Sequence, residues 1–187
     1  MADLSRVNVL IVDDNAHMMS IVRQMLRGFG IMKVYECRDA SEAFDIARTE
    51  PVDLIIFDYH MPLLDGLEFT RLVRNASDSG NPYIPIIMLT AYTERSRILA
   101  ARDAGVTEVC AKPLNANQLW LKLGAVINEP RPFVRTPRFF GPDRRRREGF
   151  DYMGEERRAD RLEAAAKAET DNGPSGDGGD EAAAAAG

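Results

Sequence analysis

Three short and almost purely apolar runs mark the first half of the chain: VNVLIV at 7–12, VDLIIF at 52–57 and IPIIML at 84–89. Each run is too short for a buried helix and is rich in branched aliphatic residues. Each therefore predicts a strand that is covered on both faces. Two weaker runs, at 31–36 and 106–110, predict further strands.

Between the runs, apolar residues recur at the three- and four-residue spacing that places them on one face of a helix. Met18, Ile21, Val22, Met25 and Leu26 form the clearest example. The same spacing predicts helices over 16–27, 40–47, 67–73, 94–104 and 114–127, with Thr93 and Asn115 as candidate N-caps of the last two.

Five strands that alternate with five helices predict an α/β fold, a doubly wound five-stranded parallel sheet. In such folds, functional side chains gather at the carboxyl ends of the strands. The composition agrees, because the chain of 187 residues is 45% hydrophobic and 28% charged, which is typical of a soluble globular domain with an appendage.

No targeting or membrane segment is expected. The N-terminus runs directly into Asp13 and Asp14, and no apolar run approaches the ~20 residues that a bilayer requires. We therefore expect a cytoplasmic protein without membrane contact. Cys37 and Cys110 form no CxxC pair and lie beside apolar runs, which indicates buried thiols rather than zinc ligands or a disulfide.

The composition changes after Ile127. Residues 128–142 contain four prolines, and residues 131–161 contain ten arginines and no lysine, although the whole chain has a net charge of −5. That net charge does not fit a generic nucleic-acid binder. We predict a folded domain over 1–128, an arginine-rich ligand-binding extension over 129–167 and a disordered acidic and Gly/Ala-rich tail over 168–187, so that most of the C-terminal part is disordered.

Polar residues stand at matching positions after the predicted strands. Asp13 and Asp14 follow the first strand, Asp58 follows the third, Thr90 ends the fourth and Lys112 ends the fifth. Three carboxylates at one sheet edge repel one another unless a cation such as Mg²⁺ lies among them. A carboxylate beside that ion can accept a phosphoryl group, whose oxygens a hydroxyl and an ammonium would bind. Acids at strand ends are often simple caps, but five matching positions favour a site.

Four motifs carry a resemblance to a known family. VDD at 12–14, FDYHMPLLDG at 57–66, LTA at 89–91 and AKPL at 111–114 resemble the response-regulator receiver domain of two-component signalling, over about residues 5–127. The resemblance implies a flavodoxin-like fold, a bound Mg²⁺ ion, and a histidine kinase or phosphotransfer protein as partner.

The resemblance also implies a role for each matching residue. Asp58 would be the phosphoacceptor, Thr90 the switch hydroxyl and Lys112 the phosphate-binding lysine. Mg²⁺ would be bound directly by Asp14 and the backbone carbonyl of His60, and partly through water by Asp13, with Asp58 as the fourth residue of the metal site. The His60 side chain is expected on the surface, and the Lys112–Pro113 bond is often cis in this family.

One position departs from the family pattern. The family's switch aromatic lies three residues before the lysine, where this chain has Val109. The usual coupling between the switch threonine and an inward-turning ring therefore cannot operate in its usual form. Tyr92 is an alternative aromatic at a different position. Phosphorylation then need not be the main input, which directs attention to the extension.

The extension contains a near-repeat. Residues 139–145 and 152–158 share the form aromatic-x-Gly-x-acid-Arg-Arg, thirteen residues apart. A solvated charge run, the simplest alternative, needs neither the glycines nor the rings and has no reason to exclude lysine. Guanidinium groups suit phosphate oxygens and the O6/N7 edge of guanine, and aromatic rings suit base stacking. Gly141 and Gly154 are expected to permit tight turns.

In composition, placement and repeat, the extension resembles that of the Cle group of CheY-like cyclic di-GMP effectors. This resemblance implies that cyclic di-GMP orders a flexible segment on binding. The ordered segment would then bind a protein partner such as the flagellar motor switch, in chemotaxis and motility. The predicted ligand residues are Arg138, Phe139, Phe140, Asp143, Arg144, Arg145, Arg146, Arg147, Tyr152, Arg157 and Arg158.

Other readings stay open at this stage. Asp143 could accept from the donor edge of guanine or form a local ion pair. Trp120 could be a packing residue or meet the ordered extension. The protein could be a phosphorylation-driven receiver with an inert tail, or an RNA- or DNA-binding regulator. No enzyme activity is expected beyond phosphorylation of Asp58 and its hydrolysis.

Overall fold

The computed structural model describes residues 4–61, 64–92 and 94–143. After a 3-10 turn over Leu4–Arg6, five strands and five helices alternate as predicted. Their bounds are β1 (Asn8–Val12), α1 (Ala16–Gly28), β2 (Lys33–Cys37), α2 (Ala40–Thr49), β3 (Leu54–Asp58), α3 (Gly66–Asn75), β4 (Ile86–Thr90), α4 (Arg95–Ala104), β5 (Glu108–Ala111) and α5 (Ala116–Asn128).

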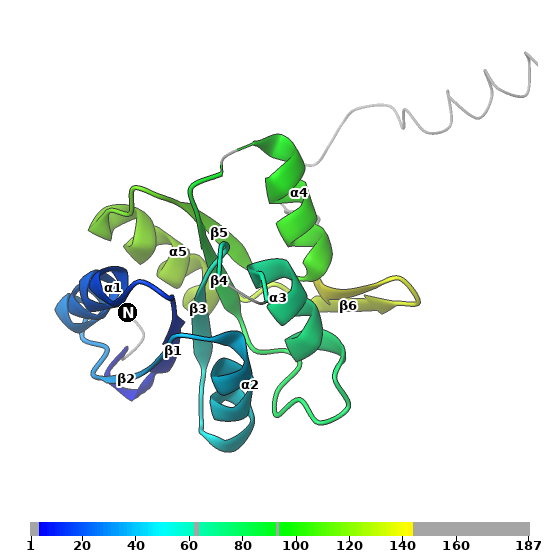
Figure 1. The fold of residues 1–187 in the computed structure, drawn as a ribbon, viewed down its shortest axis with the longest axis horizontal. Coiled ribbons are helices and arrows are strands. Elements are labelled where there is room, and N and C mark those ends of the chain that lie inside the picture. Colours follow the sequence, from blue (N-terminus) through cyan, green and yellow to red (C-terminus); the bar gives the residue numbers. More distant parts are fainter. Residues whose placement is uncertain (1–3, 62–63, 93, 144–187) are drawn as a thin grey trace, which may run out of the picture. The chain divides into compact units, whose positions relative to one another are not determined.

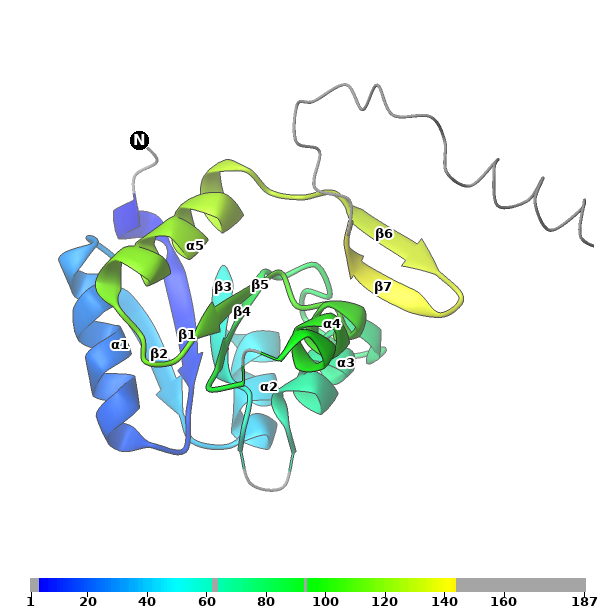
Figure 2. The ribbon, with the colours of Figure 1, turned by 90° about the horizontal axis from the view of Figure 1, so that it is seen from above.

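The five strands form one parallel sheet in the order β2-β1-β3-β4-β5, which confirms the predicted doubly wound fold. Helices α1 and α5 cover one face, and α2, α3 and α4 cover the other (Figures 1 and 2). A hydrophobic core lies on each face of the sheet, and alternate residues of β1 pack into one or the other. Val9 and Ile11 pack on the first face, and Leu10 and Val12 pack on the second. This explains why the strands are apolar at every position.

Side-chain caps begin most of the helices. The carboxylate of Asp65 accepts the N–H of Glu68 at 2.8 Å, and Glu68 completes a capping box on α3. The predicted cap Asn115 is confirmed, since its side chain accepts the N–H of Gln118 at 2.8 Å. Helix α4 starts after Glu94, which makes no side-chain cap, and Thr93 lies outside the described residues.

Both thiols and the tryptophan lie in packed positions. Cys37 and Cys110 are free and buried, as predicted, and burial raises the pKa of Cys37 to about 12. Trp120 packs against Phe29, with ring centroids 5.1 Å apart. In the part of the chain that the structure describes, no helix is long and apolar enough to cross a membrane.

The chain directly after α5 is folded, whereas the sequence predicted a flexible extension from residue 129. Strands β6 (Phe133–Thr136) and β7 (Phe139–Pro142) form an antiparallel hairpin, in which Thr136 pairs with Phe139 across a two-residue turn. The four prolines of residues 128–142 stand just before β6, in the turn or at the end of β7, where proline is tolerated. The hairpin belongs to the same compact unit as the sheet, so the folded part extends past the expected boundary at 128.

Two glycines let the hairpin lie directly on the end of α4. Gly105 follows α4 with a φ of 100°, and a Cβ there would lie 2.7 Å from the carbonyl oxygen of Phe140. A Cβ on Gly141 would lie 2.7 Å from the Cα of Gly105. The prediction that Gly141 permits a tight turn is therefore wrong, because Gly141 lies within β7, opposite Val134, and permits close packing instead.

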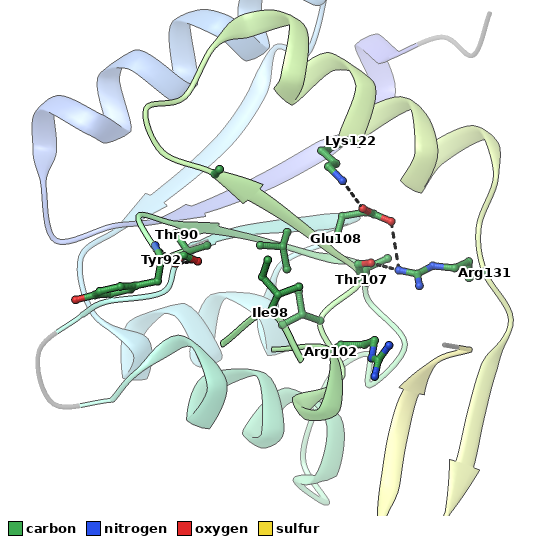
Figure 3. Close-up of a pocket in the computed structure, with 11 residues that line it drawn as sticks. Thr90, Tyr92, Ile98, Arg102, Thr107, Glu108, Lys122 and Arg131 are labelled. Atoms are coloured by element: carbon green, nitrogen blue, oxygen red, sulfur yellow. Dashed lines mark hydrogen bonds and ion pairs between the residues drawn. The ribbon is translucent and has the colours of Figure 1, made fainter. Parts of the chain in front are cut away.

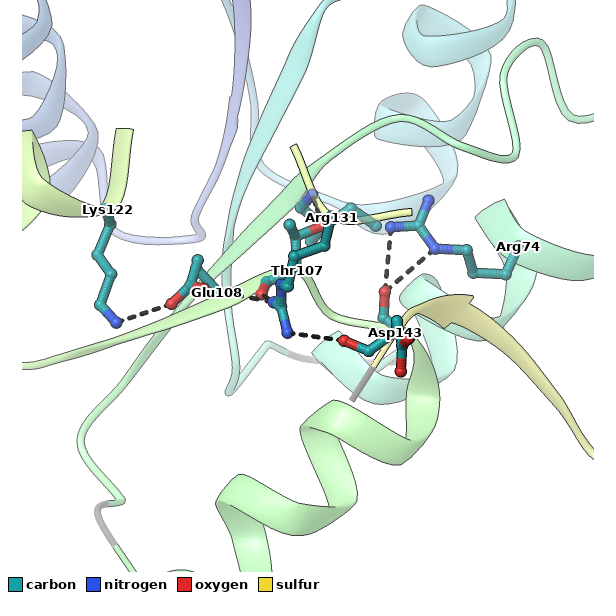
Figure 4. A network of polar contacts seen from close by, with 8 residues as sticks. Arg74, Thr107, Glu108, Lys122, Arg131 and Asp143 are labelled. Carbon is teal, nitrogen blue, oxygen red and sulfur yellow. Dashed lines mark hydrogen bonds and ion pairs between the residues drawn. The ribbon is translucent and has the colours of Figure 1, made fainter. Parts of the chain in front are cut away.

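A buried arginine holds this junction together. Arg74, at the end of α3, is 1% exposed and donates two hydrogen bonds to the carbonyl of Gly105, at 3.0 and 3.1 Å (Figure 4). Its other nitrogen donates to the carbonyls of Pro82, at 2.8 Å, and Ile84, at 2.7 Å. The ring of Phe133 covers the guanidinium at 5.0 Å. Burial lowers the pKa of Arg74 to about 9, so the group stays charged at neutral pH.

Both ends of the hairpin are tied to the start of β5. Arg131 donates to the carbonyls of Thr107 and Asp143 and lies 3.3 Å from the carboxylate of Glu108 (Figures 3 and 4). Lys122 of α5 binds the same carboxylate at 2.8 Å. Since Thr107 precedes β5, the hairpin lies at the amino-terminal edge of the sheet, opposite the edge where the site residues were predicted.

Candidate functional site

The three predicted carboxylates meet at the carboxyl ends of β1 and β3. Asp13, Asp14 and Asp58 each offer an oxygen atom, and these atoms lie within 4.8 Å of one another. Asp13 and Asp58 are buried, whereas Asp14 is exposed. Asp58 is the last residue of β3 rather than the first residue after it. An all-oxygen cluster that is open on one side fits Mg²⁺, which keeps some of its water ligands.

Lys112 neutralises part of this negative charge. Its Nζ lies 2.8 Å from Oδ1 of Asp58 and 3.4 Å from Oδ2 of Asp13. Burial alone would lower the pKa of Lys112, but the hydrogen bond and charge of Asp58, together with Asp13, outweigh it and the pKa is raised. Burial raises the pKa of Asp13, against the opposing effects of the Asn15 N–H and of Lys112. The ammonium is therefore positioned to bind an oxygen atom carried by Asp58.

Thr90 lies on the strand next to Asp58. Asp58 pairs with Leu89, so Thr90 stands one residue further along β4. The Thr90 hydroxyl is buried and accepts the N–H of Tyr92 at 2.9 Å. The Lys112–Pro113 peptide bond is cis, and the side chain of His60 is exposed, as expected. Mg²⁺ binding by the His60 carbonyl stays a prediction.

A tyrosine–arginine cluster beside Asp58 was only partly anticipated. The rings of Tyr59 and Tyr92 lie 5.8 Å apart, and the guanidinium of Arg97 lies 4.0 Å from the Tyr92 ring. Arg97 also donates to the Tyr59 hydroxyl at 3.4 Å. The sequence drew attention to Tyr92 alone, although Tyr59 directly follows Asp58. The cluster connects the loops after β3 and β4 with helix α4.

A groove runs along β5 between α4 and α5. It has a volume of about 540 Å³ and extends from Thr90 and Tyr92 to Arg131 (Figure 3). Val109, which stands where the family pattern has an aromatic residue, lines it. A valine fills less space than an aromatic ring, so this position leaves room in the groove that Thr90 also lines. The sequence predicted the loss of the ring but not the groove.

The structure describes only the first four of the residues predicted to bind cyclic di-GMP. Arg138 is exposed, and Phe139 and Asp143 are half-buried. The prediction that Phe140 stacks on a base does not fit the docked hairpin, because this side chain is 7% exposed and its ring packs against Tyr83 and Phe133. The remaining predicted ligand residues, Arg144, Arg145, Arg146, Arg147, Tyr152, Arg157 and Arg158, and the predicted tail over 168–187, lie outside the described residues.

Removing one carboxylate from the cluster should weaken Mg²⁺ binding. We expect Asp13→Asn to raise the dissociation constant for Mg²⁺ by at least about tenfold, because the amide keeps the shape but removes one of three converging charges. Isothermal titration calorimetry with magnesium chloride measures the effect. Asp45→Asn, an exposed change on α2, is the matched control. Equal affinity in both variants would contradict a metal site here.

The comparisons with known proteins agree with this geometry. Residues 9–123 match the family model described as the response regulator receiver domain. The chain is 32% identical over 121 residues to the chemotaxis protein CheY of Pseudomonas aeruginosa, covering 65% of this chain and 96% of that protein. It is 31% identical over 121 residues to CheY-3 of Vibrio cholerae, covering 65% of this chain and 92% of that protein.

Solved structures show the same fold. The chemotaxis response regulator CheY4 of Vibrio cholerae has a TM-score of 0.59 and 32% identity to this chain, over 65% of this chain and 98% of CheY4. The signal receiver domain of an HD domain-containing protein from Pseudomonas fluorescens also has a TM-score of 0.59, at 24% identity, over 66% of this chain and 95% of that domain.

Proposed function

The chain belongs to the response regulator receiver domain family, as a CheY-like protein, and we propose that cyclic di-GMP binding to its arginine-rich extension sets its output. Receiver domains of this kind interact with histidine kinases and phosphotransfer proteins and bind Mg²⁺ at an acidic pocket. In this proposal, Asp58 accepts a phosphoryl group from such a partner. Phosphorylation is then one input and the dinucleotide is the other.

One observation carries the proposal: the near-repeat at 139–145 and 152–158. Each copy holds an aromatic residue, a glycine, an acid and two arginines. A dinucleotide with two guanine bases and two phosphates presents each recognition feature twice, and arginine binds both phosphate and the O6/N7 edge of guanine. Two copies of a half-site therefore match a ligand with approximate twofold symmetry.

The receiver body supplies a second, independent argument. Val109 replaces the aromatic residue through which this family usually couples the phosphorylated site to its output face. A protein that lacks this coupling needs another way to alter that face. Arg131, the first arginine of the extension, lies beside the groove that Val109 lines, so a ligand bound to the extension can influence it.

The mechanism follows from the cost of ordering a charged segment. Ten arginines within residues 131–161 repel one another, and an anion that neutralises them offsets the lost conformational entropy. The ordered extension would then present new surface to a protein partner, of which the flagellar motor switch is our candidate. Asp143, Arg144–Arg147, Tyr152 and Arg157–Arg158 remain the ligand residues of this proposal, with Arg138 and Phe139 at its start. In this role the protein is a binding module and not an enzyme.

Calorimetric titration of the full chain with cyclic di-GMP tests the proposal. We expect cyclic di-GMP to bind at least about tenfold more tightly than GMP, because it engages both copies of the repeat. Replacing Arg144–Arg147 with four lysines keeps the charge but loses bidentate contacts, so we expect binding to fall by a similar factor.

Two results would contradict the proposal. Absence of cyclic di-GMP binding would favour a phosphorylation-driven receiver with an inert tail. Tighter binding of single-stranded RNA, with an affinity that falls steeply as salt increases and is unaffected by cyclic di-GMP, would favour a nucleic-acid-binding regulator.

A further inference from the structure

A second groove lies where the hairpin β6–β7 meets α3 and α4. It has a volume of about 430 Å³ and lies away from the acid cluster, near the amino-terminal edge of the sheet. Its polar and aromatic lining comes from three parts of the fold: Arg71 and Asn75 of α3, Asp103 of α4, and Arg135, Arg138 and Phe139 of the hairpin.

The groove concentrates positive charge. Three arginines line it against a single acid, Asp103, which gives the lining a net charge of +2 in a chain whose net charge is −5. Within the part of the chain that the structure describes, Arg71, Arg135 and Arg138 make no ion pair with a carboxylate. Like charges gathered in this way favour binding of an anion.

The hairpin presents Arg135 on a packed base and Arg138 from its turn. Arg135 lies over the ring of Phe140 at 4.9 Å, and Phe140 is itself buried against Tyr83. The backbone N–H of Arg138 donates to the hydroxyl of Thr136 at 3.4 Å within the turn, which fixes the backbone of Arg138. The guanidinium of Arg135, already placed over a ring, loses less conformational entropy on binding, so its position lowers the cost of capturing a ligand.

We propose that this groove is a phosphate subsite for a guanine nucleotide and that Arg71, a residue of the receiver body, completes it. The inference rests on the proposed function, because the ligand in question is cyclic di-GMP. Arg71, from α3, and Arg138, from the hairpin turn, both line the groove and bind phosphate oxygens through paired N–H groups. The half-buried ring of Phe139 offers an adjacent surface for a base.

The subsite lies next to the proposed arginine set along the chain. Hairpin strand β7 ends at Pro142, and Arg144–Arg147 follow directly after Asp143. A ligand held in the groove therefore contacts α3 close, along the chain, to the arginines of the proposed ligand set. Binding then depends on the receiver domain as well as on the extension, a dependence that the sequence repeat does not predict.

Substitutions at Arg71 test the subsite, because this side chain is exposed and lies outside the extension. In calorimetric titrations of the full chain with cyclic di-GMP, we expect Arg71→Gln to weaken binding at least about fivefold and Arg71→Lys at least about threefold. Arg27→Gln on α1 makes the same charge change at an exposed site and should leave the affinity unchanged. In parallel, NMR signals of the Arg71 and Arg138 guanidinium groups should shift with cyclic di-GMP and with inorganic pyrophosphate.

The outcomes separate this subsite from the proposed function. If the unmodified protein binds cyclic di-GMP and Arg71→Gln matches Arg27→Gln, the subsite is wrong while the proposed function stands. If the unmodified protein does not bind cyclic di-GMP, the proposed function fails. The NMR titration with pyrophosphate then tests whether the groove binds phosphate. Pyrophosphate shifts at Arg138 that are lost in Arg71→Gln support a phosphate subsite, and their absence overturns it.

Discussion

Replacing Asp58 with asparagine should abolish phosphorylation of the protein by acetyl phosphate. In the proposed reaction, a carboxylate oxygen of Asp58 attacks phosphorus, the bond from phosphorus to the acetate oxygen breaks, and acetate leaves. The product is an acyl phosphate on Asp58, whose oxygens lie within reach of Lys112, now 2.8 Å from the carboxylate. An amide keeps the side-chain shape but is a far poorer nucleophile, so we expect a loss of at least about 100-fold.

Intact-protein mass spectrometry measures this effect as the fraction of chains that gain one phosphoryl group. Removing Mg²⁺ from the unmodified protein should give a similar loss, because the acid cluster needs a cation to bring phosphate oxygens close to three carboxylates. Asp45→Asn removes an exposed carboxylate and should be phosphorylated normally. Undiminished phosphorylation of Asp58→Asn would place the phosphoacceptor elsewhere.

Replacing Arg74 with methionine should lower the free energy of unfolding by about 3 kcal/mol. Methionine fills most of the volume but leaves the carbonyls of Gly105, Pro82 and Ile84 without their charged donor. Each buried carbonyl that loses its partner costs roughly 1–3 kcal/mol, and relief from burying the charge offsets part of the sum. Phe133 also loses the cation beneath its ring, so the hairpin should loosen first.

Urea denaturation followed by circular dichroism gives the change in the free energy of unfolding. Arg27→Met is the matched control, since Arg27 also lies in the last turn of a helix but is exposed, and we expect a change within about 0.5 kcal/mol. If Arg74→Met were as stable as Arg27→Met, the three carbonyls would have found other partners, and Arg74 would not be what holds the hairpin.

The hydrophobic pattern predicted the sheet well because its signal is local. Runs such as VDLIIF at 52–57 are typical of a strand that is covered on both faces, and their order along the chain predicted the parallel topology. The acid cluster followed from the same reasoning. Once β1 and β3 are parallel neighbours, the residues after Val12 and at the end of β3 must meet at one edge.

The hairpin was missed because its stabilising contacts are not local. Its strands are four residues each, with proline at Pro137 and Pro142, a composition that also describes a linker. What identifies it as folded is the close approach of Gly141 to Gly105, together with a ring cluster built on Tyr83. These partners lie more than thirty residues apart in the chain, so no window of sequence contains the signal.

Arg74 gives the clearest case of a residue that sequence reasoning passed over. On a helix written GLEFTRLVRN, an arginine in the last turn is typical of a solvated position beside the helix dipole. Arg74 is buried because two loops supply carbonyl acceptors to its guanidinium and the Phe133 ring of the hairpin covers it. Val109 was predicted in part. The sequence showed that an aromatic ring is missing at this position, but only the packing of α4 and α5 showed a groove there.

The sequence alone was therefore enough to determine the α/β fold, the edge of the sheet at which the carboxylates meet and the change of amino-acid composition after Ile127. These properties depend on periodicity and on strand order, which neighbouring residues encode. Only the tertiary structure decided that the start of the extension is a folded hairpin, that Phe140 is a core residue and that Arg71 and Arg138 line one groove. Those outcomes depend on which distant surfaces fit together, and that fit is a property of the packed molecule.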